Sequence, residues 1–537
     1  MKSRFFPVGV SLLLYGVLCL SLLASALALT GGAVGYPLDD TFIHMAMARH
    51  FAQDGRWSID LRPFTSVTSS PLWTLLLSGA FRLVGALDWV PLALNLLIGV
   101  GALIYAAGLL DTRMSRLPQV VLLALLLLFT PLPVLALTGM EHTLHAVLSA
   151  ALLFTGARFV AERKPATCLR WSFLALCALL PVTRYEGLFL LLPILLALAF
   201  QRRWIDALSS VAAGASLMSL YGWISIANGW DFLPNPVLVK GQVDLGTILG
   251  MVRFLNHGIN SLLITPALFG LILAVLLAYI VAEMRTVLDS SQRWRVLIFT
   301  GMFALHLQLA QVGWFFRYES YLIFCGMLVL ADLGASLLQS MLSSSRANIT
   351  TKRARFSPSL VAGLALAVLL LLPLAYRSGN ALSTYPLAVR NIHEQQVQMG
   401  RFLRQFYNGQ SVAANDIGAI AFMTDLRLLD FLGLATREVA QLRANNQWSS
   451  REVRQLVETH QPMVVILYGL WFEEVIPAEW TEVGRWQIQD NVVVGHDTIM
   501  FYVVDPAKQS QLAANLKAFS SSLPPSVIQS GMYLNGP

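Results

Sequence analysis

The sequence predicts a polytopic α-helical membrane protein with a C-terminal soluble α/β domain. Of its 537 residues, 56% are hydrophobic and only 12% are charged, and the mean hydropathy is +0.63. Soluble domains carry about twice that share of charged residues. Long apolar runs recur up to residue 376, and beyond Arg377 they become too short to cross a bilayer. Composition therefore excludes a wholly soluble protein.

Twelve apolar segments are candidates for membrane helices. They lie near residues 8–30, 71–86, 90–110, 118–137, 142–161, 170–183, 187–200, 205–227, 261–282, 296–313, 320–342 and 359–376. Segment 71–86 is short and contains Arg82, so we interpret it as a juxtamembrane or re-entrant piece. A different division of 170–200 is the alternative, and it leaves the parity of the crossings unchanged. The sequence thus predicts about 11 transmembrane helices.

Charge sets the expected orientation of these helices. The net charge is +7, and basic residues gather in short connectors, which the positive-inside rule places in the cytoplasm. The basic connectors are 111–116, 162–164, 201–204, 283–295 and 343–356. The N-terminal run resembles a signal peptide, but the many later spans favour a retained first helix. We therefore expect the N-terminus inside and the C-terminus outside.

Several function classes find no support in the residues. No basic patch is interleaved with aromatic residues, so nucleic acid is not an expected partner. The four cysteines fit neither a zinc site nor a disulfide framework, and we interpret them as packing residues. There is no Walker loop, no GxGxxG followed by a suitable acidic residue, and no evident internal repeat.

The soluble domain is predicted to span 378–537, after a transmembrane module at 1–377. An amphipathic helix is expected from about 388 to 407, and a second helix near 450–459. Four runs have strand character, namely SVAAND, RLLDFLGL, PMVVILYG and HDTIMFYVVD. The tail after Pro524 is expected to be poorly ordered.

The first outer loop, 31–70, contains a pair of acidic residues at the membrane edge. Asp39 and Asp40 follow Tyr36-Pro37, and residues 41–53 have helical character with Gly55 as a C-terminal stop. Carboxylates at a helix N-terminus are favoured in the ionised form, ready to accept a proton or a metal ion. The alternative is that one of them is simply an N-cap.

The later outer connectors add further ionisable residues on the same expected side. Such groups at membrane depth are costly and mark a substrate path, so we predict one polar cavity that opens outward. Arg184, Lys240 and Arg317 offer cations suited to a phosphate. As alternatives to a phosphate role, Arg184 could form a local ion pair with Glu186, and Arg317 with Glu319. The aromatic residues Tyr185, Trp314 and Tyr318 could belong to an ordinary interfacial belt, and His44 could have a structural role.

These stretches resemble GT-C membrane glycosyltransferases, which use a polyprenyl-phosphate-linked sugar donor. More narrowly, they resemble the bacterial arabinofuranosyltransferase and mannosyltransferase-like branch. The motifs that carry the resemblance lie between residues 36 and 434. They are LDDTFIHMAMARHFAQDG, TSSPLW, TGMEHTL, TRYEG, LPNPVLVKG, FRYESYL and AANDIGAIAFMTDLRLLDFLGL.

The resemblance implies an inverting transfer of a sugar to a cell-envelope glycan, lipid or protein acceptor. The reaction would take place on the outer face of the bacterial plasma membrane. Asp39 is the first choice for the base that deprotonates the acceptor, and Asp40 is the second. Arg184, Lys240 and Arg317 are expected to bind the donor phosphate. The expected substrate-binding residues are His44, Glu141, Glu186, Asn235 and Tyr318.

No cofactor is predicted with certainty. A divalent cation held by Asp39, Asp40 and Glu141 stays open, because these carboxylates lack a ligand spacing typical of a metal site.

Two other classes of function remain alternatives. One is a transporter or flippase of a glycolipid, although such proteins usually show inverted repeats and broken helices at the midplane. The other is a noncatalytic glycan-assembly protein.

Overall fold

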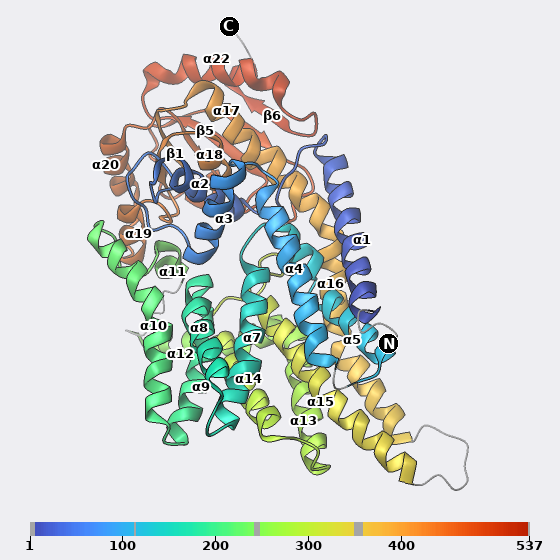
Figure 1. The fold of residues 1–537 in the computed structure, drawn as a ribbon. Helices are drawn as coiled ribbons and strands as arrows, with labels where there is room; N and C mark the ends of the chain where they lie inside the picture. The colour runs from blue at the N-terminus through green and yellow to red at the C-terminus, as the bar shows by residue number, and fades with distance from the viewer. Residues whose placement is uncertain (1–5, 112–113, 241–246, 348–357, 535–537) are drawn as a thin grey trace.

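The computed structural model describes residues 6–111, 114–240, 247–347 and 358–534, which form two stacked parts. Long apolar helices make one part, and a six-stranded sheet covered by helices lies at one end of them (Figure 1). The chain is thus a multi-pass helical membrane protein with a C-terminal domain that contains a sheet, as predicted.

The helical bundle follows the predicted apolar runs closely. Its helices are α1 (Phe6–Leu29), α4 (Val90–Leu110), α5 (Arg116–Phe129), α6 (Leu132–Leu137), α7 (His142–Ala161), α8 (Thr167–Thr183), α9 (Leu188–Phe200), α10 (Trp204–Ala227), α12 (Ile248–Ile264), α13 (Pro266–Met284), α14 (Ser290–Leu309), α15 (Ser320–Ala347) and α16 (Pro358–Ile392). Within the described residues, seven helices are long and apolar enough to cross a membrane, and four shorter apolar helices accompany them. The number of crossings stays a prediction.

Two bundle segments differ from the expected runs. The run 118–137 is divided into α5 and α6 at Pro131, because proline has no N–H and its ring clashes with the preceding turn of a helix. Helix α12 was not predicted as a separate element. Its apolar residues are interrupted by polar ones such as Arg253 and His257, so no continuous apolar run marks it.

The first outer loop contains α2 (Asp39–Asp54), and α3 (Pro71–Val84) follows it directly. Helix α2 ends as predicted at Gly55, whose φ of 70° lets its N–H donate to the carbonyl of Phe51. Leu38 is the N-cap of α2, so neither aspartate has that role there. Helix α3 packs on α2 near the sheet (Figure 1), which is the placement expected of a juxtamembrane segment.

The sheet has the strand order β2-β1-β3-β5-β4-β6. Its strands are β1 (Ser411–Ala414), β2 (Arg427–Asp430), β3 (Val465–Leu467), β4 (Thr481–Gln487), β5 (Thr498–Val503) and β6 (Ile528–Gly531). Strand β1 is parallel to both β2 and β3, whereas the other pairs are antiparallel. All four predicted strand runs are confirmed.

Helices surround the sheet and connect its strands. They are α17 (Gln398–Phe406), α18 (Gly418–Met423), α19 (Arg437–Ala444), α20 (Ser450–His460), α21 (Gly469–Phe472) and α22 (Gln509–Phe519). The prediction of a poorly ordered tail after Pro524 is wrong. Residues 528–531 form β6 and pair with β4, a strand that the sequence analysis missed because polar residues flank its buried Trp486.

The hydrophobic core does not follow the predicted domain boundary. Helix α16 runs without a break across residues 377 and 378. Phe42 of α2 and Trp73 of α3 belong to the same buried cluster as Ile420 and Trp486 of the sheet domain. The first outer loop therefore packs with the sheet domain as one body, and the division at 377/378 stays a prediction.

Candidate functional site

A cavity of about 420 Å³ lies where the outer loop, the bundle and the sheet domain meet. Ionisable residues from three different connectors line it, namely Asp40, His44, Arg184, Glu186 and Arg317. Apolar side chains complete the wall, and they include Leu188, Phe189, Met218, Val237 and Leu434. The predicted convergence of outer connectors on one cavity is thus what the structure shows.

Asp40 forms an ion pair with Arg317 in this cavity. Arg317 Nη2 lies 2.5 Å from Asp40 Oδ2 and donates a second hydrogen bond to the hydroxyl of Tyr318. The Arg317 side chain is 2% exposed, whereas that of Asp40 is 33% exposed. The carboxylate therefore keeps a surface that faces the cavity. The local pair of Arg317 with Glu319, which was an alternative, does not form.

An unusual turn presents Arg317 to Asp40. Gly313 and the next three residues, Trp314 to Phe316, all have positive φ between 40° and 85°. Left-handed backbone costs about 1–2 kcal/mol for each residue that is not glycine, so other contacts must hold this turn. Glu319 accepts the N–H of Gly313, and Arg377 binds both Glu319 and the carbonyl of Phe316.

Arg184 is held between two carboxylates. Its Nη1 lies 2.6 Å from Glu141 Oε1, and its Nη2 lies 2.6 Å from Glu186 Oε1, so the predicted local pair with Glu186 does form. Glu141 is fully buried. The ring of Tyr318 lies 5.8 Å from the guanidinium carbon of Arg184 and 4.9 Å from that of Arg317. Tyr318 thus brings two cations together through favourable cation–π contacts.

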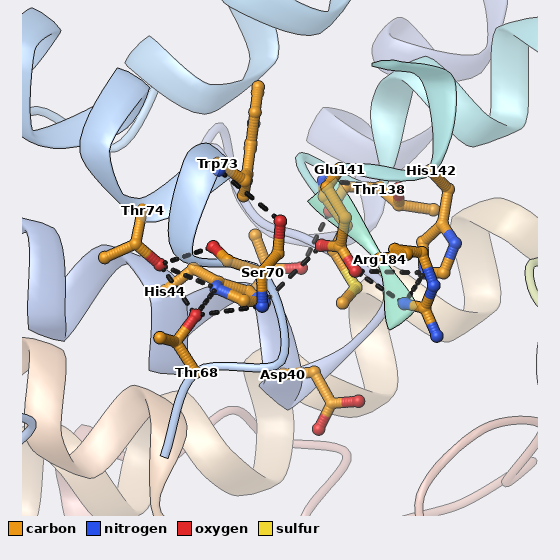
Figure 2. Close-up of polar contacts among 12 residues, drawn as sticks. Asp40, His44, Thr68, Ser70, Trp73, Thr74, Thr138, Glu141, His142 and Arg184 are labelled. Carbon is orange, nitrogen blue, oxygen red and sulfur yellow. Dashed lines mark hydrogen bonds and ion pairs between the residues drawn. The ribbon is translucent and has the colours of Figure 1, made fainter. Parts of the chain in front are cut away.

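His44 connects α2 to this cluster. Figure 2 shows its ring between Thr68, Thr74 and Glu141, with Asp40 on the other side and directed away from it. His44 Nδ1 lies 3.2 Å from each threonine hydroxyl, and Nε2 lies 3.5 Å from Glu141 Oε2. Burial lowers the pKa of His44, so the ring is neutral near pH 7. Both a structural and a substrate-binding role fit this placement.

Asp39 points to the sheet domain and does not line the cavity. Its two carboxylate oxygens accept the N–H groups of Gly418 and Ala419, at 2.7 and 2.8 Å, at the start of α18. Burial and, second, the nearby charge of Asp416 raise the pKa of Asp39 to about 8, against the lowering effect of the two hydrogen bonds. Asp39 therefore binds the sheet domain, whereas Asp40 lines the cavity.

Stability should fall as the pH rises through the pKa of Asp39. An aspartate in an unfolded chain titrates near about 3.9, so the native state binds this proton more tightly. The stability that the protonated carboxyl contributes is complete below about pH 4 and is lost as the pH rises to about 8. We expect Asp39→Asn to flatten the fall of the melting temperature between about pH 5 and 9. Asp54→Asn, an exposed change in the same helix, should leave the slope unchanged, and an equal slope in Asp39→Asn would contradict this assignment.

Asn235 and Lys240 both belong to the short helix α11 (Asn235–Lys240). Asn235 donates to the carbonyl of Gly433 in the sheet domain and does not line the cavity, although its neighbours Pro236 and Val237 do. This hydrogen bond connects α11 to the loop that contains Leu434, a residue of the cavity wall. The side chain of Lys240 lies outside the described residues.

A metal site does not arise from the predicted carboxylates in the described part of the chain. No three His, Cys, Asp or Glu side chains gather there in a way that would hold a metal ion. Asp39, Asp40 and Glu141 each bind a different partner. A divalent cation stays a prediction.

Sequence reasoning missed two residues that the structure places at the site. Arg377 was interpreted only as the end of the last apolar run, yet it binds Glu319 and the carbonyl of Phe316 in the turn before Arg317. Asp416 was not among the predicted site residues, although its charge acts on that of Asp39. In both cases the partner is distant in sequence, so spacing gave no signal.

Comparisons with known proteins place this fold. A family model described as "Domain of unknown function (DUF8728)" matches residues 390–502. Comparison with curated protein sequences gives no match. The crystal structure of ArnT from Cupriavidus metallidurans bound to undecaprenyl phosphate is similar over 92% of this chain and 98% of that chain, with 13% identity and a TM-score of 0.50.

A second solved structure is similar over nearly the same span. The archaeal oligosaccharyltransferase AglB from Archaeoglobus fulgidus, in complex with an inhibitory peptide and a dolichol-phosphate, covers 91% of this chain with 12% identity and a TM-score of 0.48. The match covers 74% of the AglB chain. The ArnT comparison confirms the predicted fold class, a polytopic helical membrane protein with a C-terminal sheet-containing domain.

Proposed function

We propose that this protein is an inverting glycosyltransferase that uses a polyprenyl-phosphate-linked sugar. Its acceptor is a hydroxyl of a cell-envelope glycan, lipid or protein, and the reaction takes place on the outer face of the bacterial plasma membrane. The observation that carries the proposal is the cavity in which a partly exposed carboxylate, Asp40, meets Arg317 and Arg184. The undecaprenyl phosphate in the ArnT structure, which shares the fold, supports the choice of donor.

Asp40 is the proposed general base. It lines the cavity, whereas both carboxylate oxygens of Asp39 already accept backbone N–H groups. The acceptor hydroxyl attacks the anomeric carbon, the new carbon–oxygen bond forms as the bond to the lipid phosphate breaks, and the proton passes to Asp40. The phosphate leaves with the electron pair. Attack opposite to the leaving group inverts the anomeric centre.

The arginines are the proposed partners of the donor phosphate. Arg317 is bound to a single carboxylate, whereas Arg184 is bracketed by two. A phosphate that enters the cavity therefore competes most readily for Arg317. In exchanging Asp40 for the phosphate, Arg317 would no longer stabilise the ionised carboxylate, so donor binding would make Asp40 a stronger base. Preorganised cations of this kind stabilise the charge of the leaving group. Lys240, at the end of α11, remains a third proposed cation for the phosphate.

The apolar wall of the cavity is suited to the first units of a prenyl chain. Leu188 and Phe189 of the turn into α9 and Met218 of α10 all lie on helices of the bundle. An apolar lining with a few convergent polar groups is typical of a small-molecule site. The lipid tail would then run toward the bilayer while its phosphate reaches Arg317.

A transfer assay tests the proposal. The full chain, reconstituted in vesicles, is incubated with polyprenyl phosphates that carry radiolabelled arabinofuranose or mannose, and with membrane extract as acceptor. We expect label to move from the lipid to a product that resists mild acid, which cleaves the donor. Label that only crosses the vesicle membrane would indicate a flippase, and label that stays on the lipid would indicate a noncatalytic protein.

A further inference from the structure

A second group of polar residues lies in the sheet domain, outside the cavity. Asp416 follows β1 by two residues, and Tyr468 directly follows β3. Because β1 and β3 are parallel, both residues lie at the same edge of the sheet. That edge faces α2, since the N–H groups of Gly418 and Ala419, four and five residues after the end of β1, bind Asp39.

The topology of the sheet marks this edge as a place for a ligand. The strand order is β2-β1-β3, so β2 and β3 lie on opposite sides of β1, and the chain crosses from one side to the other between β2 and β3. In open α/β sheets, ligands bind in the crevice beyond the carboxyl ends of the strands at such a switch point. Asp416 and Tyr468 are two polar side chains that follow the neighbouring strands β1 and β3 at this edge.

These side chains are held in fixed positions by a buried amide. Gln396 is 1% exposed, and its Nε2 lies 2.7 Å from Asp416 Oδ2 and 2.9 Å from the hydroxyl of Tyr468. The Tyr468 hydroxyl also donates to Asp416. Gln396 Oε1 is buried without a hydrogen-bond partner in the described part of the structure. A buried polar atom that lacks a partner is costly, so the unpaired amide oxygen calls for a functional explanation.

The backbone around Gln396 has a special form. Residues His393–Val397 make a π-helical turn between α16 and α17. Such turns are rare and occur mostly at functional sites, where they redirect a side chain. Here the turn places two consecutive glutamines, Gln395 and Gln396, within hydrogen-bonding distance of Tyr468.

An exposed aromatic residue borders the group. The ring of Trp471 lies 5.1 Å from that of Tyr468, at the edge of α21, and Trp471 is 48% exposed. A half-exposed indole beside carboxylate and amide groups combines an apolar face with hydrogen-bonding groups. Sugars have this combination of surfaces, because their C–H face packs on an aromatic ring while their hydroxyls bind carboxylates and amides.

We propose that the partly exposed Asp416 and Trp471 form a carbohydrate subsite for the acceptor, in which the buried Gln396 and Tyr468 hold Asp416 in position. The inference rests on the proposed transferase function and extends it, because it assigns a glycan to the acceptor side. The subsite lies across Asp39 from Asp40, since Asp39 binds the N–H groups that follow Asp416 in sequence. An acceptor bound there would present its terminal hydroxyl to the base from the side of the sheet domain.

Direct binding tests the subsite without the reaction. Saturation-transfer NMR is recorded for the full chain in detergent with arabinofuranose and mannose tetrasaccharides as probes. We expect transfer to at least one probe, reduced at least fivefold in Asp416→Asn and in Trp471→Ala. Leu470→Ala, an exposed change on the same helix, and Asp505→Asn, an exposed aspartate elsewhere in the domain, are matched controls that should bind as the wild type does.

Kinetics separate this inference from the transferase proposal. If sugar transfer occurs, Asp416→Asn should raise the KM for the acceptor about tenfold and leave the affinity for the donor lipid unchanged. Glycan binding without any transfer would contradict the proposed function and retain the subsite. Transfer with normal acceptor KM in both variants, or wild-type protein that binds neither probe, would overturn the subsite. If an added peptide displaces the tetrasaccharide probe, the site would be assigned to a protein acceptor and the carbohydrate subsite would be overturned.

Discussion

Asparagine in place of Asp40 is expected to lower kcat for sugar transfer by about 10²- to 10⁴-fold, the range that a positioned base contributes. The amide has the shape of the carboxylate and can still accept a hydrogen bond from Arg317, but it cannot take the proton of the acceptor hydroxyl. The KM for the donor lipid should change little. Initial rates with labelled donor, measured in vesicles at saturating acceptor, provide the test.

The neighbouring aspartate is the matched control for this change. Asp39→Asn has the same chemistry one residue away, at a side chain that binds the backbone of α18 and does not line the cavity. We expect it to retain at least tenfold more activity than Asp40→Asn. The opposite order would give the role of the base to Asp39, which the sequence analysis put first.

Glutamine in place of Arg317 is expected to lower kcat/KM for the donor by about 10²- to 10³-fold, as the loss of a preorganised partner of transition-state charge does elsewhere. The variant should still fold, because the Asp40 side chain left behind is 33% exposed and water can solvate it. Titration with unlabelled polyprenyl phosphate should show weaker binding, since the guanidinium is the group that the phosphate engages. A melting curve checks the fold.

Loss of one positive charge elsewhere serves as the comparison for Arg317. Arg170 pairs with Asp206 and is 39% exposed, far from the residues that line the cavity. Arg170→Gln should leave donor binding and turnover as they are in the wild type. Normal donor affinity in Arg317→Gln would remove the phosphate assignment, and equal losses in both variants would reduce it to an effect of net charge.

Helix positions followed from local properties of the sequence. Apolar runs and stop residues act over a few residues, so α2 with Gly55, the bundle helices and four of the strands were predictable. The failures have a common cause in longer-range packing. Strand β6 is ordered because it pairs with β4, and neither strand has a strong pattern by itself. Helix α12 is amphipathic and lacks a continuous apolar run.

The sequence indicated which residues line the cavity, but it did not indicate which of them form ion pairs with one another. The common side of the outer connectors indicated that Asp40, Arg184 and Arg317 would meet, and they line one cavity. The partners within the set depend on backbone geometry that spacing does not encode. The left-handed turn before Arg317 directs it to Asp40 and leaves Glu319 to Arg377. The contact of Asp39 with α18 joins residues that are 379 positions apart.

The two consecutive aspartates of α2 have a consequence for protein engineering. Asp39 accepts hydrogen bonds from the backbone of the sheet domain, and the next residue, Asp40, lines the cavity. The helical bundle and the sheet domain therefore cannot be exchanged independently of each other. A chimera that imports a foreign sheet domain must supply two free amide hydrogens at the start of a helix in the same place. Without these two N–H groups, the start of α2, which carries Asp40, would lose its contact with the sheet domain even if every residue that lines the cavity were retained.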